Sequence, residues 1–424
     1  MAFIGIVLAI TGVLGGNDAT VDPSTSGDDQ APLRVVVGNV VSLTGPLSGF
    51  GEPAQKAAHL AEAEIRRAIS EVDAKYAVEV VDRDDQSDAS RGVAVARQVV
   101  QRRAVCLTGG VAPSIAAAVA SQAAIPEGVA YASVAPMAPR VRRGDSGRVI
   151  SSVSVPEARQ GEALAIAMER DLGGAQGKIV NVAARTDSYG AELSAAFRKA
   201  WRARLGRIGA VVSYRPGSVR YDAVAQRITY PKPSAYAVFD YPDSFSRLRA
   251  ALLHTEWDPD VTYVTDTLAS STQAAAAGRE GEGVRGTTPG IFVNSQAARA
   301  FDQLFAKAKG PDRQIFDAQE FDAVVLCYLA TVAAGSSEPG KIAQKMREIS
   351  SPGGTRYSWQ RLAAAIRAVE HGKDIDYEGA SGPIDLDHRG DATAGVYDLF
   401  QYRDRKLDIF DQVVIRGTGQ GSLE

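Results

Sequence analysis

Ser114 has surroundings that suggest chemistry. It lies in 107-LTGGVAPSIAAAVA-120, where an apolar run meets two glycines, a proline and a helix of small residues. A catalytic triad is disfavoured, because the serine is not in a G-x-S-x-G turn and no histidine follows a predicted strand. A phosphate site is disfavoured, because the glycines match neither G-x-G-x-x-G nor a P-loop. Two compatible roles remain open: Ser114 caps its helix, or it shares the free N–H groups of that helix with a bound carboxylate.

An acidic run follows the second predicted strand and contains Asp82, Asp84, Asp85 and Asp88. A calcium loop of the EF-hand type is disfavoured, because its glycine and its terminal glutamate are absent. We expect a solvated acidic turn that caps the next helix. Four histidines and two cysteines leave little material for a zinc or iron site. The sequence therefore predicts no metal and no cofactor.

Three aromatic residues, Phe50, Tyr189 and Tyr241, are each followed by glycine or proline near a predicted strand end. In open parallel sheets, ligands bind outside the carboxyl ends of the strands. An aromatic ring at such a position either covers an apolar ligand or packs in the core. Both interpretations stay open for each ring on local evidence.

Strands and helices alternate from residue 33 onward and form two consecutive series. The predicted strands are 33–41, 77–82, 104–110 and 129–134, then 178–184, 210–214, 234–241 and 261–266. The predicted helices are 53–69, 89–100 and 114–124, then 157–172, 191–204, 221–229 and 242–254. This alternation predicts an α/β fold with two doubly wound lobes and mostly parallel sheets. A single barrel is the alternative, and the irregular region 267–300 disfavours it.

The rest of the chain is less regular. Residues 267–290 are rich in alanine, glycine and serine, and we interpret them as a crossing between lobes. Residues 294–350 predict helices, and 381–414 predict a terminal hairpin-like stretch. Cys106 and Cys327 lie in apolar runs, which favours two buried free thiols over a disulfide.

The charge and the first residues bear on location. The formal charge is -3, from 47 basic and 50 acidic residues, and gives no sign of nucleic-acid binding. Residues 1–16 are mostly apolar and resemble the apolar part of a secretion signal, followed by a polar linker. Leu14-Gly15-Gly16-Asn17 resembles a lipoprotein box with Asn17 in place of the lipid-bearing cysteine. We expect export or the stub of a membrane anchor, with a disordered leader as the alternative.

Five motifs in order carry a family resemblance: LTGPLSGFGEPAQKAA, VDRDDQSDASRGVAVARQVV, GVAYASVAP, DSYGAEL and IDLDHRGDATAGVYDLFQY. From about residue 33 to 414 the chain resembles the type I periplasmic solute-binding proteins, especially the branched-chain amino-acid (leucine/isoleucine/valine) binding family of ABC transporters. The resemblance implies two lobes joined by three crossings, with the ligand between them. After a leader and linker at 1–32, lobe one would comprise 33–153 and 290–397. Lobe two would comprise 154–289 and 398–424.

The resemblance also implies ligand contacts in lobe one. Ser114 falls where the family's serine binds the ligand carboxylate. Ala135 falls where a backbone carbonyl accepts a hydrogen bond from the ligand amine, and Phe50 falls where an aromatic packs on the ligand. Met137 stands where amino-acid binders usually have threonine or serine, so one hydroxyl donor to the carboxylate is missing.

In lobe two, the resemblance implies contacts at three strand ends. Tyr189 belongs to the Tyr-Gly turn, and Asp240 or Tyr241 matches an aromatic contact. Asp266 or Thr267 matches the acidic group that pairs with the ligand ammonium. These carboxylates favour an amino acid or a related amine or amide as ligand, and an uncharged or aromatic-acid ligand stays open.

The implied function is a non-enzymatic, extracytoplasmic substrate-binding protein that closes two lobes on a small molecule and delivers it to an ABC permease. Membrane contact would occur only through the N-terminus or the permease. The protein would be periplasmic or associated with the cell surface. The alternative is a ligand-sensing ectodomain of a receptor or signalling protein with the same fold. An enzyme is disfavoured, because no set of strand ends offers a nucleophile, a base and oxyanion donors together.

Overall fold

The computed structural model describes residues 33–415, apart from 138, 147, 216, 218, 219, 293 and 294. The apolar leader, the lipoprotein-like box and the polar linker lie outside the described residues.

Five parallel strands form the first sheet, in the order β2-β1-β3-β4-β5. Its strands are β1 (Leu33–Val41), β2 (Tyr76–Asp84), β3 (Cys106–Gly109), β4 (Ala130–Ser133) and β5 (Ile150–Ser152). β1 is buried along most of its length, and β3, β4 and β5 are buried throughout. Such continuous apolar runs are typical of parallel strands that are covered on both faces.

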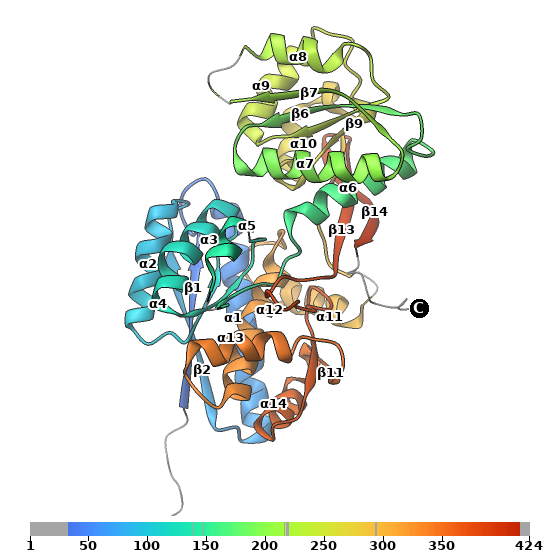
Figure 1. The fold of residues 1–424 in the computed structure, drawn as a ribbon. Helices are drawn as coiled ribbons and strands as arrows, with labels where there is room; N and C mark the ends of the chain where they lie inside the picture. The colour runs from blue at the N-terminus through green and yellow to red at the C-terminus, as the bar shows by residue number, and fades with distance from the viewer. Residues whose placement is uncertain are drawn as a thin grey trace, which may run out of the picture. The chain divides into compact units, whose positions relative to one another are not determined.

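Helices cover both faces of this sheet (Figure 1). One face packs against α1 (Ser48–Val72) and α12 (Asp317–Ala334). The other face packs against α2 (Ala89–Gln101), α3 (Pro113–Val119), a π-helical segment (Ala120–Ala124), α4 (Ile125–Glu127) and α5 (Pro139–Gly144). The core beside α1 and α12 extends to α11 (Gln296–Lys307), α13 (Pro339–Glu348), α14 (Leu362–Glu370) and the small parallel pair β11 (Thr355–Ser358) and β12 (Ile375–Glu378).

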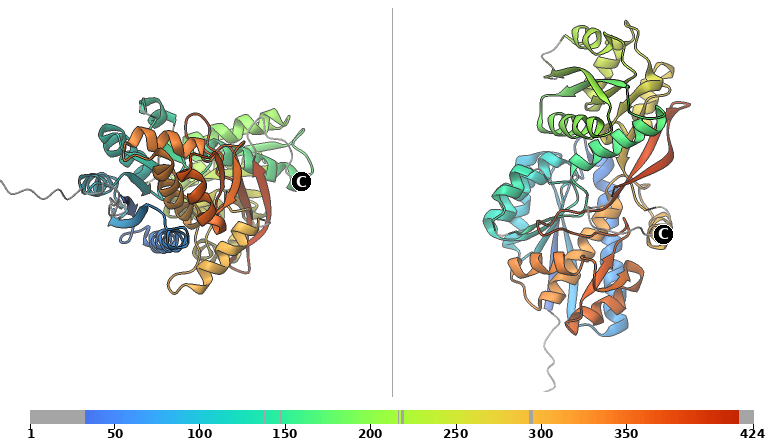
Figure 2. Two further views of the ribbon diagram at one scale, coloured as in Figure 1. Left: turned by 90° about the horizontal axis from the view of Figure 1, so that it is seen from below. Right: turned by 45° about the vertical axis from the view of Figure 1, so that its right-hand side comes forward.

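The second sheet has seven strands in the order β14-β13-β10-β9-β8-β6-β7. They are β6 (Ile179–Arg185), β7 (Arg207–Tyr214), β8 (Ala235–Phe239), β9 (Thr262–Val264), β10 (Arg285–Pro289), β13 (Gly395–Arg403) and β14 (Lys406–Ile415). The first five are parallel to one another, whereas β13 and β14 form an antiparallel hairpin at one edge. Figure 2 shows this hairpin, in red, from two further directions.

The second sheet is also covered on both faces. One face packs against α6 (Glu157–Asp171) and α7 (Ser188–Ala203). The other packs against α8 (Tyr221–Thr229), α9 (Pro242–Leu252) and α10 (Ser271–Ala277). Short 3-10 segments lie at Pro259–Val261, Asp266–Leu268, Arg279–Gly281 and Trp359–Arg361.

The predicted alternation of strands and helices is confirmed, and so are the α/β class, the helices within 294–350 and the terminal hairpin. The interpretation of 267–290 as a mere crossing is wrong, because this region contains α10 and the inner strand β10. Both are short and lack the apolar periodicity on which the prediction depends. In the described residues no single helix is long and apolar enough to cross a membrane, although the bent pair α12 and α13 meets that test together.

A disulfide joins Cys106 at the start of β3 to Cys327 in α12, with the two Cα atoms 5.9 Å apart. The expectation of two free thiols is therefore wrong, although both cysteines are fully buried as expected. The packing of α12 against β3 brings together two residues that are 221 positions apart. Two apolar runs in a sequence contain no sign of such a long-range neighbour.

Candidate ligand-binding site

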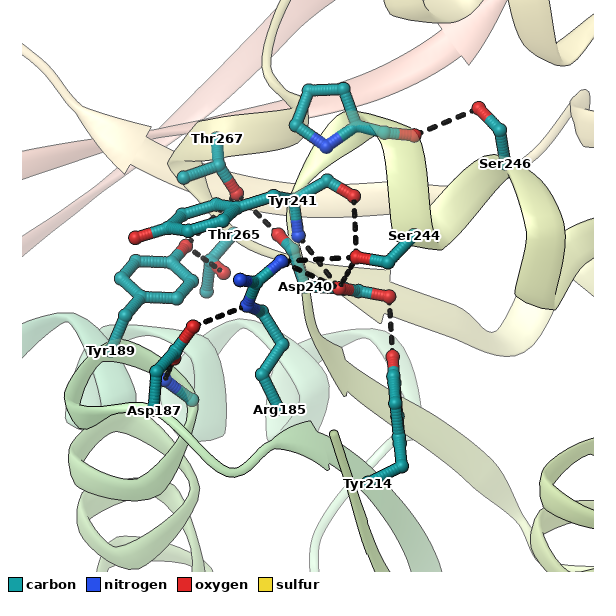
Figure 3. Close-up of polar contacts among 12 residues, drawn as sticks. Arg185, Asp187, Tyr189, Tyr214, Asp240, Tyr241, Ser244, Ser246, Thr265 and Thr267 are labelled. Atoms are coloured by element: carbon teal, nitrogen blue, oxygen red, sulfur yellow. Dashed lines mark hydrogen bonds and ion pairs between the residues drawn. The ribbon is translucent and has the colours of Figure 1, made fainter. Parts of the chain in front are cut away.

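Polar and aromatic side chains gather at the carboxyl ends of β6, β8 and β9 (Figure 3). Arg185 ends β6, Asp240 follows β8, and Asp266 begins the short segment after β9. These strands are parallel neighbours, so their carboxyl ends meet at one edge of the sheet, which is where ligands bind in open α/β sheets.

Tyr189 lies in the first turn of α7 and is nearly completely buried. Asp187 caps this helix by accepting a hydrogen bond from the N–H of Gly190. A side chain at Gly190 would meet the carbonyl oxygen of Arg185 at 2.4 Å, so only glycine fits this turn. The Tyr189 hydroxyl donates to Oδ1 of Asp266 at 2.8 Å.

Tyr241 stacks on Tyr189, with ring centroids 4.9 Å apart and planes 28° apart. The guanidinium of Arg185 also lies over the Tyr241 ring, 4.0 Å from its centroid. Two stacked rings and a cation over one of them restrict how either tyrosine can move. The pair therefore offers a preformed aromatic surface beside the carboxylates.

Asp240 is fully buried and accepts hydrogen bonds from Tyr214, from Ser244 and from the N–H of Tyr241. Arg185 lies 3.6 Å from its Oδ1. Burial raises the pKa of Asp240, and the hydrogen bonds and the arginine oppose this rise. Its carboxylate is thus occupied by protein groups, which is typical of a residue that positions others.

Asp266 differs from Asp240 in its partners. Asp266 is half-buried, and burial raises the pKa of its carboxyl group. Hydrogen bonds from Tyr189 and Gln160 oppose this rise. Within the part of the chain that the structure describes, Asp266 makes no ion pair. Arg185, the cation of this cluster, binds Asp187 at 2.6 Å and also faces Asp240. The cluster therefore has more acidic than basic groups, and Asp266 is an acid of the cluster without a cationic partner among the described residues.

Ser114 is the second residue of α3 and is exposed. The expectation that it is the N-cap is wrong, because Ala112 holds that position, without a side-chain hydrogen bond. Pro113 occupies the first helical position, which it favours because it has no N–H to leave unpaired. Ser114 remains in the first turn, where backbone N–H groups lack helical acceptors.

The other residues expected on the side of the first sheet are less available to a ligand. The Ala135 carbonyl accepts hydrogen bonds from the hydroxyls of Ser133 at 2.8 Å and Ser152 at 3.2 Å. Met137 is buried in the core on the α2 and α3 side of the first sheet. Phe50 is half-buried near the start of α1 and packs against the core on the opposite side. The structure thus brings four expected residues together at one edge of the second sheet: Tyr189, Asp240, Tyr241 and Asp266. The other four belong to the first sheet and its helices: Phe50, Ser114, Ala135 and Met137.

The acidic turn is only partly as expected. Asp88 caps α2 by accepting from the N–H of Arg91 at 2.8 Å, so the predicted capping is confirmed. The turn is not fully solvated, because Asp85 is buried and Oδ1 accepts from the hydroxyl of Ser42 at 2.6 Å. Burial raises the pKa of Asp85, against the effect of that hydrogen bond.

Sequence reasoning missed Arg185, Ser244 and Thr265 as members of the cluster. Arg185 begins the stretch RTDSYGAEL directly after a predicted strand, and this position at a strand end could have identified it as a member of the cluster. Thr265 lies one residue before Asp266, and its hydroxyl is 2.8 Å from that of Tyr189.

Known proteins resemble this chain in sequence and in fold. A family model described as periplasmic binding protein matches residues 34–371. The Leu/Ile/Val-binding protein BraC3 of Rhizobium johnstonii is 24% identical over 387 residues, which is 89% of this chain and 95% of that protein.

Two solved structures have the same fold. One is the branched-chain amino acid transporter substrate binding protein LivJ of Streptococcus pneumoniae in complex with isoleucine, with a TM-score of 0.68, 18% identity and coverage of 90% of this chain and 99% of that one. The other is an ABC transporter solute binding protein of R. palustris in complex with benzoate, with a TM-score of 0.62, 19% identity and coverage of 90% and 97%. Because the family model spans well over half of its length, the chain belongs to the periplasmic binding protein family.

Proposed function

We propose that this protein is the extracytoplasmic substrate-binding protein of an ABC importer, and that its ligand is an amino acid or a close analogue with an ammonium group. The observation that carries the proposal is Asp266, a half-buried carboxylate in the lobe-two cluster with no cationic partner among the described residues. Lobe closure on the ligand is the conformational change that the fold would use.

An ammonium group is the complement that Asp266 lacks. A partly buried carboxylate is costly to keep charged when no cation is near, which is why its pKa is raised. A ligand ammonium at hydrogen-bond distance would offset that cost and favour the ionised form. The relative named a Leu/Ile/Val-binding protein and the isoleucine complex support the same ligand class.

A purely anionic ligand, such as the benzoate of the R. palustris structure, fits this cluster less well. Arg185 is held by Asp187 and faces Asp240, so its charge is already compensated. A ligand carboxylate near Asp266 would meet a second negative charge. The aromatic pair Tyr189 and Tyr241 would instead cover an apolar side chain of the ligand.

For the ligand carboxylate, we propose the first turn of α3, with Ser114 as hydroxyl donor and Phe50 packing nearby. Ser114 is exposed, and no described group occupies its hydroxyl. Ala135 and Met137 remain proposed neighbours of the ligand. The Ala135 carbonyl already accepts hydrogen bonds from the hydroxyls of Ser133 and Ser152, so a hydrogen bond from the ligand amine would be a third one.

The disulfide supports export. Disulfides persist in oxidising compartments and are rare in the reducing cytosol. A fully buried bond between Cys106 and Cys327 fits a protein that folds in the periplasm or at the cell surface. A ligand-sensing ectodomain is the alternative use of the same fold, and a requirement of the gene for uptake of the ligand by cells would distinguish transport from sensing.

The test is isothermal titration calorimetry with a panel of amino acids, each paired with the same molecule lacking its amino group. Wild type should bind at least one amino acid and should bind its deaminated partner far more weakly. Asp266→Asn keeps the shape and the acceptor for Tyr189 but removes the charge. It should weaken amino-acid binding by roughly 30-fold or more, since breaking a buried charge pair costs about 2–5 kcal/mol.

Asp374→Asn is the matched control: Asp374 is exposed just before β12, so this substitution removes the same charge without touching the cluster at β6, β8 and β9. It should bind like wild type. Equal affinity of Asp266→Asn and wild type would contradict the assignment of Asp266. Binding of deaminated acids alone would contradict the ligand class.

A further inference from the structure

A polar row crosses the first sheet on the face that α1 and α12 cover. Asp82 of β2, Asn39 of β1 and Thr108 of β3 pair with one another in register, so their side chains lie side by side on this face. The positions two residues earlier on the same three strands are apolar core residues: Val80, Val37 and Cys106. Glu320, in the first turn of α12, faces this row at Thr108.

Four oxygen atoms in this place lack hydrogen-bond partners among the described residues. They are Oδ1 of Asn39, Oγ1 of Thr108 and both carboxyl oxygens of Glu320, and all three residues are fully buried. The orientation of Asn39 is fixed, because its Nδ2 donates to Asp82 at 2.8 Å and a carboxylate can only accept. Its Oδ1 is therefore an acceptor without a donor.

If Glu320 is ionised, the cluster of Asn39, Thr108 and Glu320 has fewer hydrogen-bond donors than its acceptors need. Three oxygens would then be pure acceptors, and the Thr108 hydroxyl would supply the one available proton. The charge would also be buried beside the negative Asp82, with no cation to pair with it. A proton on Glu320 removes that charge and adds the second donor, so the neutral acid matches its surroundings.

The ionisation equilibria agree with this count. Burial raises the pKa of Glu320 to about 8; the Thr108 hydroxyl opposes the rise, and the charge of Asp82 adds to it. The position of Glu320 in the first turn of α12 favours its charge through the helix dipole, which is a small effect compared with burial. Burial also raises the pKa of Tyr131 on β4, whose side chain lies in the core on the opposite face of the sheet, and the charge of Glu320 would raise it further, so that tyrosine stays neutral.

The remaining charged groups near the row are compensated. His59 of α1 binds Asp82 at 2.6 Å and Glu62 at 3.2 Å. The hydrogen bond to Asp82 raises the pKa of His59 to about 9, so this pair stays charged around neutral pH. Asp85, also near Tyr131, is bonded to Ser42. As the pH rises from neutral to about 8, Glu320 is thus the group of this row that loses its proton, whereas His59 follows at about 9.

We propose that Glu320, Thr108 and Asn39 form a buried proton-binding site in the first lobe, in which Glu320 carries the proton at neutral pH and supplies the donor that this cluster of acceptors lacks. The site lies between β3 and α12. β3 ends at Gly109, and the chain then continues through Gly110 to Ser114 in α3. It is independent of the ligand and of the function proposed above.

The site makes a signed prediction for stability. The native state keeps a proton that the unfolded chain releases in the ordinary range of a glutamic acid. The free energy of unfolding therefore falls as the pH rises from that range to about 8, and this contribution is constant above it. Glu320→Gln keeps the shape and the donor but cannot ionise, so its profile lacks this fall.

The experiment compares thermal unfolding of wild type and Glu320→Gln in the absence of ligand between pH 5 and pH 10. The difference between the melting temperatures of the variant and of wild type should increase in favour of the variant up to about pH 8 and should be constant above it. A pH-independent offset measures only the packing of glutamine. Glu127→Gln, at an exposed glutamate of α4, is the matched control and should follow wild type at every pH.

Two further measurements keep the proposal testable if Glu320→Gln does not fold. Infrared difference spectra of wild type should show the carbonyl stretch of a protonated carboxylic acid that disappears around pH 8. Thr108→Val, which removes the hydroxyl that stabilises the charge, should move that midpoint to higher pH. A constant difference between wild type and Glu320→Gln at all pH values, or no carboxylic-acid signal at neutral pH, would overturn the proposal. Stabilisation of wild type by sodium but not by choline above pH 8 would also overturn it, because a metal cation would then occupy the place of the proton.

Discussion

The hydroxyl of Tyr189 lies 2.8 Å from Oδ1 of Asp266, and the two residues come from α7 and from the segment after β9, 77 positions apart. The tyrosine holds one oxygen of the carboxylate in place. It also lowers the cost of ionising an acid that burial otherwise keeps closer to neutral. The pair therefore links the aromatic surface to the charged end of the candidate site.

Tyr189→Phe tests that link. The ring remains available to stack on Tyr241, so stability should change little. Affinity for an amino acid should fall by roughly 10–150-fold, because a hydrogen bond to a charged group is lost. Calorimetric titration measures the affinity, and thermal unfolding checks the fold. Tyr230→Phe is the control, because Tyr230 is 81% exposed. Unchanged affinity in Tyr189→Phe would argue that Asp266 does not contact the ligand.

Binding should depend on pH through Asp266. An ammonium ligand pairs with the ionised carboxylate, so its affinity should be constant around neutral pH. Below the pKa of Asp266 in the ligand-free protein, the affinity should fall about tenfold per pH unit. Because burial raises that pKa, the fall should begin at a higher pH than for an ordinary aspartate. Titrations from pH 4 to pH 8 measure it, and Asp266→Asn should give a flatter profile. Equal slopes in both proteins would assign the pH dependence to other groups.

The cross-link between β3 and α12 should be a main source of stability. Replacing both Cys106 and Cys327 with alanine should lower the free energy of unfolding by about 2–5 kcal/mol, since the bond restricts the unfolded chain over a long loop. Urea unfolding measures the change. A reductant present throughout unfolding should bring wild type to the value of the variant and leave the variant unmoved. If reductant has no effect on wild type, the bond is absent in solution.

Asp322 in α12 should anchor the loop that follows β12. Its buried carboxylate accepts from the N–H groups of Ala380 at 2.6 Å and Ser381 at 2.8 Å, and from the Tyr377 hydroxyl at 3.1 Å. In Asp322→Asn an amide hydrogen must face one of these donors, so stability should fall by about 2–4 kcal/mol. Tyr377→Phe removes a single hydrogen bond and should cost about 0.5–1.5 kcal/mol. Urea unfolding measures both, and equal losses in the two variants would contradict this role.

The architecture could be predicted from the sequence because it depends on local periodicity. Apolar runs and helical spacing recur every few residues, so most of the elements could be predicted. β10 was missed because its five residues, RGTTP, carry no apolar run, and its place in the sheet depends on β9 and β13 on either side. Its strand character comes from tertiary neighbours.

The candidate site could be predicted only where one residue carries the signal. Tyr189, Asp240, Tyr241 and Asp266 stand at strand ends, and parallel strands bring those ends together. The compensation of Arg185 by two acids and the pairing of the two cysteines are long-range contacts, which local spacing does not encode. The N-cap was misplaced by two residues, because Pro113 rather than Ser114 begins the helix.

The second sheet begins at Ile179 and ends at Ile415. When the chain is synthesised or translocated from its N-terminus, the second sheet stays incomplete until β14 emerges. In the same way, α12 can pack on the first sheet only after most strands of the second sheet have been made. Contacts over such distances form slowly. A chain that stops before β14 would leave β13 as an open edge, and open edges pair with other chains. Premature termination late in the message should therefore yield aggregates rather than a shorter working protein.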